Sequence, residues 1–125
     1  MDDLVTWIRQ QLDDDERLAR AAYQPNWRWY TEDKVVVTKQ DDAGECEQWI
    51  PVGTRSDGAH MARHDPARVL AEVDAKRRLL TQFELRGNSV RGIVQPSTGG
   101  VWDDLLRMLA LPYADRSGYR SEWRP

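Results

Sequence analysis

Two histidines, His60 and His64, are the residues whose type and spacing come closest to a chemical motif. They stand four positions apart in a segment of helical character, so both imidazoles fall on one face where a single metal ion can bridge them. A tetrahedral site needs a further ligand, which Asp15, Glu16 or Cys46 would have to supply. One hypothesis is therefore a metal-dependent hydrolase using His60, His64 and Asp15, with Asp15 or Glu16 as the base. The pattern favours the other interpretation, a structural pair at a helix joint.

Other reactions find less support in the sequence. Cys46 stands between two glutamates in a predicted strand, so we expect a buried or half-buried, inert thiol. As the single cysteine it excludes an internal disulfide and a multi-cysteine zinc ribbon. The glycines at positions 92, 99 and 100 lack the spacing and the following lysine of a phosphate-binding loop. The sequence indicates no catalytic residue and no cofactor, and favours a protein that is not an enzyme.

Composition narrows the remaining function classes. A chain of 125 residues is long enough for one core of its own, so we expect a single domain over residues 1–125. The net charge of −3, with 18 basic and 21 acidic residues interspersed, disfavours nucleic-acid binding, although a nucleic-acid accessory protein stays an alternative. No basic leader and no apolar run of membrane-spanning length is present, which predicts a cytoplasmic protein without membrane contact.

The histidines must be positioned by helices. Apolar residues at helical spacing predict a helix over 2–22, and Asp15 falls on its apolar stripe, where it needs a partner. Thr54 is a candidate cap for a short helix over 55–64. Asp65 followed by Pro66 predicts the start of a longer helix over 66–85, because Asp caps well and Pro suits the first helical position.

Between these helices lies a segment rich in aromatic and β-branched residues. It predicts three antiparallel strands, at 27–31, 34–39 and 45–50, within a sheet over 27–50. Alternation places Trp27 and Trp29 on one strand face, and Val35 and Val37 likewise, so these four are core candidates. Alternation also leaves open whether Tyr30 and Trp49 are partly buried or are exposed contact residues.

The C-terminal part is less regular. Residues 87–100 hold several glycines and a proline and predict a loop, with a short strand over 90–94 as an option. A last helix over 101–111 follows, and Pro112 stops it. The tail over 112–125 keeps Tyr119 and Trp123, so it should pack back on the domain. The fold class that follows is α+β, with a small three-stranded antiparallel sheet and three to four helices packed on one face.

Several blocks of sequence resemble a known family. They are HMARHDPARVLAEVDAKRRLL at 60–80, LALPYAD at 109–115 and YRSEWRP at 119–125, with LDDDE at 12–16 and the pair Trp27-Arg28. Together these blocks resemble domain of unknown function 6221, from actinobacteria and their phages. The resemblance covers nearly the whole chain and brings no activity with it. Many members of that family carry an insertion with cysteine pairs that resembles a small zinc ribbon. Residues 86–100 of this chain hold no cysteine.

The function hypothesis combines these observations. We expect a non-enzymatic interaction or regulatory module of phage or mobile-element type that acts through a protein partner, with a homodimer left open. Six tryptophans in 125 residues support it, because exposed aromatic residues often anchor interfaces. Trp49, Trp123 and Tyr30 are the candidate interaction residues.

Overall fold

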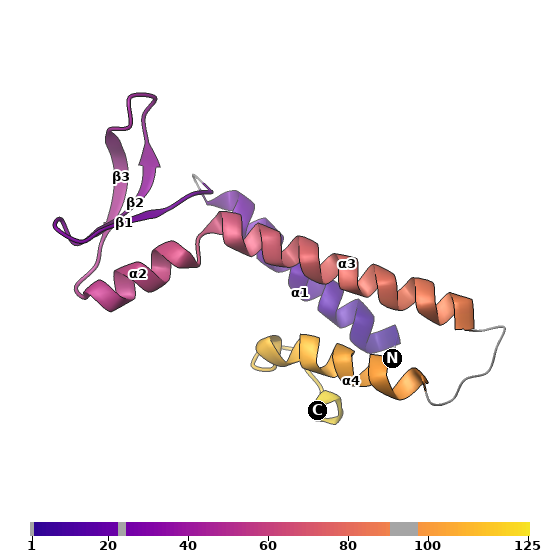
Figure 1. The fold of residues 1–125 in the computed structure, drawn as a ribbon. Helices are drawn as coiled ribbons and strands as arrows, with labels where there is room; N and C mark the ends of the chain where they lie inside the picture. The colour runs from indigo at the N-terminus through magenta and orange to yellow at the C-terminus, as the bar shows by residue number, and fades with distance from the viewer. Residues whose placement is uncertain (1, 23–24, 91–97) are drawn as a thin grey trace. The chain divides into compact units, whose positions relative to one another are not determined.

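The computed structural model describes residues 2–22, 25–90 and 98–125 (Figure 1). Within these ranges the chain forms an antiparallel sheet of three strands together with four α-helices, so the α+β class is confirmed. The helices are α1 (Asp2–Ala21), α2 (Arg55–Arg63), α3 (Pro66–Val90) and α4 (Thr98–Ala110), and the strands are β1 (Arg28–Tyr30), β2 (Val35–Gln40) and β3 (Cys46–Pro51). Two short 3-10 helices follow α4, namely η1 (Leu111–Tyr113) and η2 (Ser121–Trp123).

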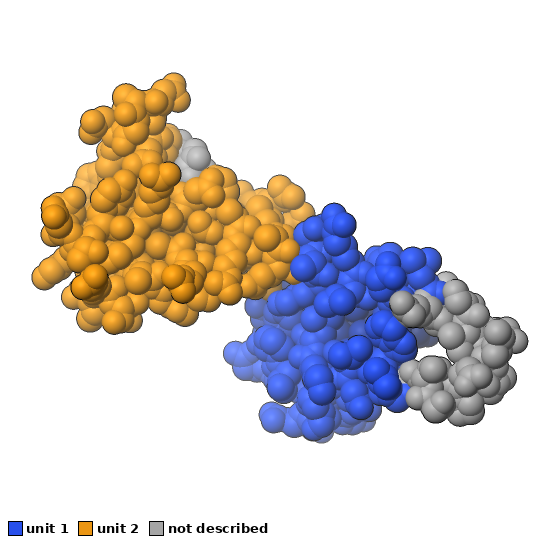
Figure 2. All heavy atoms as spheres, viewed as in Figure 1, with its two compact units in different colours: residues 1–14, 74–125 blue, residues 15–73 orange. Residues whose placement is uncertain are grey.

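The chain gathers into two compact units, coloured separately in Figure 2. Unit 1 comprises residues 1–14 and 74–125, and unit 2 comprises residues 15–73. Unit 2 therefore contains the whole sheet and α2, whereas unit 1 contains α4 and the C-terminal tail. That the chain behaves as a single domain stays a prediction.

The sheet of unit 2 follows the chain order β1-β2-β3, with both pairs antiparallel. Trp29 stands opposite Val36, and Val37 stands opposite Trp49. The register shifts after Val37, so the end of β2 pairs irregularly with β3. Since side chains alternate along a strand, Trp29 and Val36 share one face, while Val37 and Trp49 share the other.

The first of these faces, called the inner face below, packs against α2. Gly58 of α2 is buried, and a Cβ atom built there would lie 2.2 Å from two ring carbons of Trp29. The helix therefore needs glycine at this position to approach the indole. Val36 is fully buried on this face. Of the two core candidates on β2, Val37 is buried as predicted, although on the opposite face, whereas Val35 is only half-buried. The register of the β1–β2 turn, which alternation alone does not fix, makes the difference.

Both predicted helix starts are confirmed. The Thr54 hydroxyl accepts the backbone N–H of Asp57 at 3.2 Å. One carboxylate oxygen of Asp65 accepts the N–H of Arg68 at 2.9 Å, which caps α3, and the other accepts the N–H of Trp27 at 3.1 Å. Asp65 thus ties the start of α3 to the segment that leads into β1.

In unit 1 the tail packs against α1. Trp7 of α1 lies 5.5 Å from Tyr119 and 5.6 Å from Trp123, measured between ring centroids, and its indole N–H donates to the carbonyl of Ser117. Gly118 has φ of +88°, and a Cβ there would lie 2.8 Å from the Trp7 indole nitrogen. The expectation that the tail packs back on the chain is confirmed by these contacts.

Side chains join α1 to α3 within unit 1. Arg9 pairs with Glu84 at 2.8 Å and Arg77 pairs with Asp13 at 2.6 Å. Each of these surface ion pairs contributes about 0.2–1 kcal/mol to the stability of the fold. They therefore help to orient α1 and α3 within unit 1 more than they stabilise it. The main stabilisation comes from apolar side chains of α1, of which Leu4, Ile8 and Leu12 are fully buried.

The predicted loop over 87–100 overlaps the ends of two helices. α3 continues to Val90 and α4 already begins at Thr98, so the prediction was wrong at both ends, and residues 91–97 lie outside the described residues. The alternative of a short strand over 90–94 is wrong for Val90, because Val90 belongs to α3. The other residues of that strand lie outside the described residues. Across the described ranges no helix combines the length and apolarity needed to cross a membrane.

Candidate functional site

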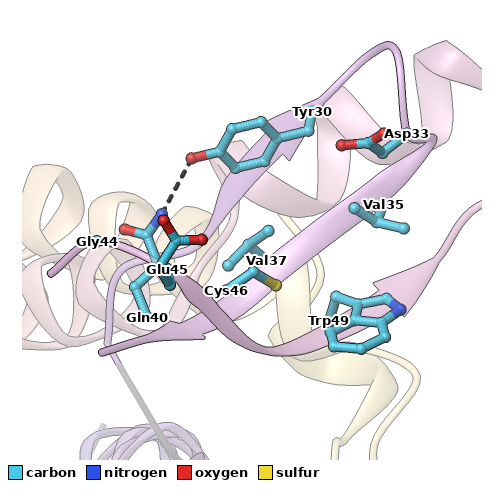
Figure 3. A pocket seen from close by; sticks show the side chains of 9 residues that line it. All are labelled: Tyr30, Asp33, Val35, Val37, Gln40, Gly44, Glu45, Cys46 and Trp49. Atoms are coloured by element: carbon cyan, nitrogen blue, oxygen red, sulfur yellow. Dashed lines mark hydrogen bonds between the residues drawn. The ribbon is translucent and has the colours of Figure 1, made fainter. Parts of the chain in front are cut away.

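The outer face of the sheet carries a concave surface, which we call the hollow (Figure 3). It has a volume of about 400 Å³. Its floor is formed by Val35 and Val37 of β2, and aromatic side chains from both edge strands stand beside them. The lining residues are Tyr30, Asp33, Val35, Val37, Gln40, Gly44, Glu45, Cys46 and Trp49.

Two aromatic residues of the hollow are open to solvent. Trp49 exposes 55% of its surface and Tyr30 exposes 37%, and every residue of β3 is exposed. The Gln40 side-chain amide donates to the Tyr30 hydroxyl at 3.0 Å (Figure 3). This bond holds the phenol ring over the hollow. The structure therefore places two of the three candidate interaction residues together on one exposed surface.

The turns at either end of β2 are locally encoded. Lys34, before β2, has φ of +54°, and its carbonyl accepts the N–H of Val52 at 2.9 Å. After β2, one carboxylate oxygen of Asp41 accepts the N–H groups of Ala43 and Glu45, at 2.9 and 2.8 Å. Gly44 has φ of +85°, which glycine adopts without strain. These turns set the registers that bring Tyr30 and Trp49 to the same face.

The charge around the hollow is mainly negative. Residues 28–51 contain six acidic and three basic residues. Asp33 and Glu45 line the hollow itself, whereas Lys39 pairs with Glu47 at 2.7 Å. The arrangement thus offers an apolar floor, two aromatic faces and a carboxylate rim. A side chain that is apolar along its length and positively charged at its end matches this combination.

Cys46 also lines the hollow and is exposed. The sequence analysis was wrong to expect a buried or half-buried thiol. The reason is that β3 is an edge strand whose six residues are all exposed. The sulfur lies 3.8 Å from the carbonyl oxygen of Gln48.

His60 and His64 lie together at the C-terminal end of α2. Their rings stack with centroids 4.2 Å apart and planes tilted by 31°. His64 Nδ1 lies 2.9 Å from the carbonyl oxygen of His60, so this ring also closes the end of the helix. The predicted shared face is therefore observed, and the contacts are those of a pair at a helix joint.

Among the described residues, the structure brings no third metal ligand to the two histidines. In residues 2–22, 25–90 and 98–125 no three His, Cys, Asp or Glu side chains come close enough to hold a metal ion together. Asp15 is half-buried, as its place on the apolar stripe predicts, and it has an interaction partner. A metal site using His60, His64 and Asp15 stays a hypothesis without a supporting ligand cluster.

Trp123, the third candidate interaction residue, is buried rather than exposed. Only 6% of its surface is accessible. It packs on Trp7 and Tyr119, and the Arg120 guanidinium lies 5.1 Å from the centre of its ring. The prediction of an exposed anchor at this position was wrong, because the tail folds back into a cluster of aromatic rings.

Sequence reasoning missed the polar and apolar residues that surround the two aromatic anchors. Gln40, Asp33 and Glu45 fell in predicted turns, loops or strand ends. Val37 was predicted as core and is buried, yet it also lines the hollow. The available signal was the alternation along β2 read together with β3. Val37 can share a face with Trp49 only if Val36 faces inward.

Comparison with known proteins gives a family without an activity. The whole chain, residues 1–125, matches the sequence profile described as "Family of unknown function (DUF6221)". No curated protein and no solved structure is similar enough to the chain to count as a match. The match covers both units, including the hollow and the histidine pair. The chain therefore belongs to the DUF6221 family.

Proposed function

We propose that this protein is a non-enzymatic interaction module of phage or mobile-element type that binds a protein partner through the hollow. The observation that carries the proposal is the exposure of Trp49 beside Tyr30 on an open sheet face. Tryptophan and tyrosine are the residues that most often carry binding energy at interfaces. An apolar floor with a polar rim is also the usual anatomy of a protein-binding surface.

The chemistry of the hollow specifies the kind of partner segment. The half-buried Val35 offers apolar contact beside Trp49, over a floor that includes the buried Val37. Asp33 and Glu45 supply negative charge at the rim. A segment that places a large apolar or aromatic side chain next to an arginine or lysine satisfies both. The cationic group can also lie over the face of Trp49, a contact that contributes about 0.5–1 kcal/mol at exposed sites.

The test is selection from a random peptide library displayed on yeast, with the purified protein as bait. We expect enriched peptides to carry an aromatic or large aliphatic residue beside a basic one. In solution the Trp49→Ala variant should bind them at least about 30-fold more weakly, the loss expected for a hot-spot residue. The matched control is Leu18→Ala, which removes an equally exposed apolar side chain from α1 and should bind like the wild type.

Two results would count against the proposal. One is enrichment of peptides that bind Trp49→Ala as tightly as the wild type. The other is selection of acidic peptides, because the carboxylate rim should repel them.

The hydrolase alternative has its own test. Native mass spectrometry of the untagged protein after addition of zinc should give the same spectrum for the wild type and for His60→Ala. A zinc adduct that survives desalting in the wild type and disappears in His60→Ala would instead support the metal site.

A further inference from the structure

A second open apolar surface lies on α4, in unit 1. Val101, Leu105 and Met108 are exposed to 61%, 47% and 57%. They are separated by four and then three residues, so they form one stripe along the helix, which we call the α4 seam. The opposite side of α4 is also apolar, because Leu106 and Ala110 are buried in unit 1. A helix that is apolar on two sides is typical of one that is covered on both.

The seam continues into a groove between α3 and α4. The groove has a volume of about 310 Å³, and every lining residue that the structure describes is apolar, including Leu79, Phe83 and Trp102. Phe83 and Trp102 line it with ring centroids 6.2 Å apart, and Leu79, also a lining residue, is 55% exposed. An apolar surface that extends over two helices marks an interaction site, and lack of polar groups is typical of obligate interfaces.

We infer that the α4 seam pairs with the α4 seam of a second copy of this chain, antiparallel and about a two-fold axis near Leu105. The order of residues along the helix supports this occupant. Around such an axis Leu105 meets its own counterpart, and Val101 lies beside Met108 of the other copy. The apolar stripe is thus complementary to itself, as a two-fold interface requires.

The charges that flank the seam favour the same arrangement. Asp104 is exposed on one flank, and Arg107 follows three residues later on the same side of the helix but further from the seam. In the antiparallel pair each Asp104 therefore lies beside Arg107 of the other copy. Arg107 donates to the carbonyls of Glu122 and Arg124 through one guanidinium nitrogen, which leaves further donors for a carboxylate.

Sedimentation over a wide range of protein concentrations tests the pairing. The wild type should sediment with twice the 14.5 kDa mass of one chain. Leu105→Lys should raise the dimer dissociation constant at least about 30-fold, because the seam centre loses its apolar contact in both copies. The matched control is Leu18→Lys, the same change at an exposed leucine outside the seam, which should leave the dimer intact.

Disulfide trapping tests the orientation. The exposed Cys46 is first changed to serine, and single cysteines are then introduced in that background. Leu105→Cys should form a covalent dimer on oxidation. Val101→Cys should not do so alone, but should when mixed with Met108→Cys.

The inference would be overturned by a wild type that stays monomeric at every concentration, or by a Leu105→Lys variant that dimerises like the wild type. Ready self-trapping of Val101→Cys would overturn the antiparallel orientation, because Val101 meets its own counterpart only in a parallel pair. Circular dichroism of Leu105→Lys should match the wild type, because the substituted side chain is already half-exposed. A folded monomer is the expected state of this variant.

Discussion

The two faces of the sheet use tryptophan in opposite ways. On the inner face Trp29 lies against Gly58 so closely that no side chain fits between them, whereas on the outer face Trp49 leaves more than half of its surface in solvent. Both residues belong to edge strands next to β2. The difference teaches that residue type and strand position do not decide which tryptophan is structural. What decides it is whether a helix packs against that face.

Removing the inner tryptophan should have the largest effect on stability. Trp29→Ala deletes the ring that fills the space beside Gly58, and loss of a large aromatic side chain from a packed site costs about 3–5 kcal/mol. Because the Trp29 indole N–H is buried without a hydrogen-bond partner among the described residues, the lower end of this range is expected. Chemical denaturation measures the loss, and a cost below about 1 kcal/mol would contradict close packing on this face.

Filling the contact from the helix side should cost less. Gly58→Ala adds a methyl group where ring carbons of Trp29 lie 2.2 Å away, so ring or helix must shift, and such overpacking costs about 1–3 kcal/mol. Trp29→Leu should rescue part of this cost, since a smaller side chain leaves room for the methyl group. Additive losses in the double variant would show that the two positions do not touch.

The joint that leads from α2 to α3 gives a third, smaller effect. Asp65→Ala removes the cap of α3 and the acceptor of the Trp27 N–H, and the loss of a helix cap costs about 0.5–2 kcal/mol. Asp65→Asn keeps one acceptor oxygen and can retain only one of the two hydrogen bonds, so its loss should be smaller than that of Asp65→Ala. Equal melting temperatures for Asp65→Ala and the wild type would show that the cap does not contribute.

The outer face should give the smallest change in stability. Trp49→Ala alters an exposed side chain, and surface changes of this kind lie within about 0.5 kcal/mol. Trp49→Ala should also keep the wild-type dimer, while Leu105→Lys should keep peptide binding in the hollow. A variant that loses both properties at once would show that the two surfaces are not independent.

Local patterns predicted much of the fold. The start of α2 was predicted from Thr54, and the start of α3 from Asp65 and Pro66. Turn residues placed the ends of the three strands to within about two residues of their observed positions. These features depend on neighbours along the chain, so one sequence suffices to predict them. The histidine pair followed from helical spacing alone, and its rings do stack.

Features that depend on distant contacts were harder to predict. The side of β2 that faces α2 depends on the register of its turns, so alternation alone did not show that Val36 packs there while the buried Val37 lies on the opposite face. Whether Trp123 is exposed depends on where the tail folds, which helical or strand periodicity does not encode. Apolar spacing also does not tell which of two apolar sides of the last helix faces the same chain, and Leu105 is half-exposed whereas Leu106 is buried.

The contrast between the two sheet faces is tested most directly by hydroxyl-radical footprinting of the free protein. Oxidation at each tryptophan is read by mass spectrometry. The structure predicts rapid oxidation of Trp49, with Tyr30 also modified, and slow oxidation of Trp29, which is partly covered by α2. Equal rates at Trp49 and Trp29, or protection of Trp49 in the free protein, would contradict an open binding face on the outer side of the sheet.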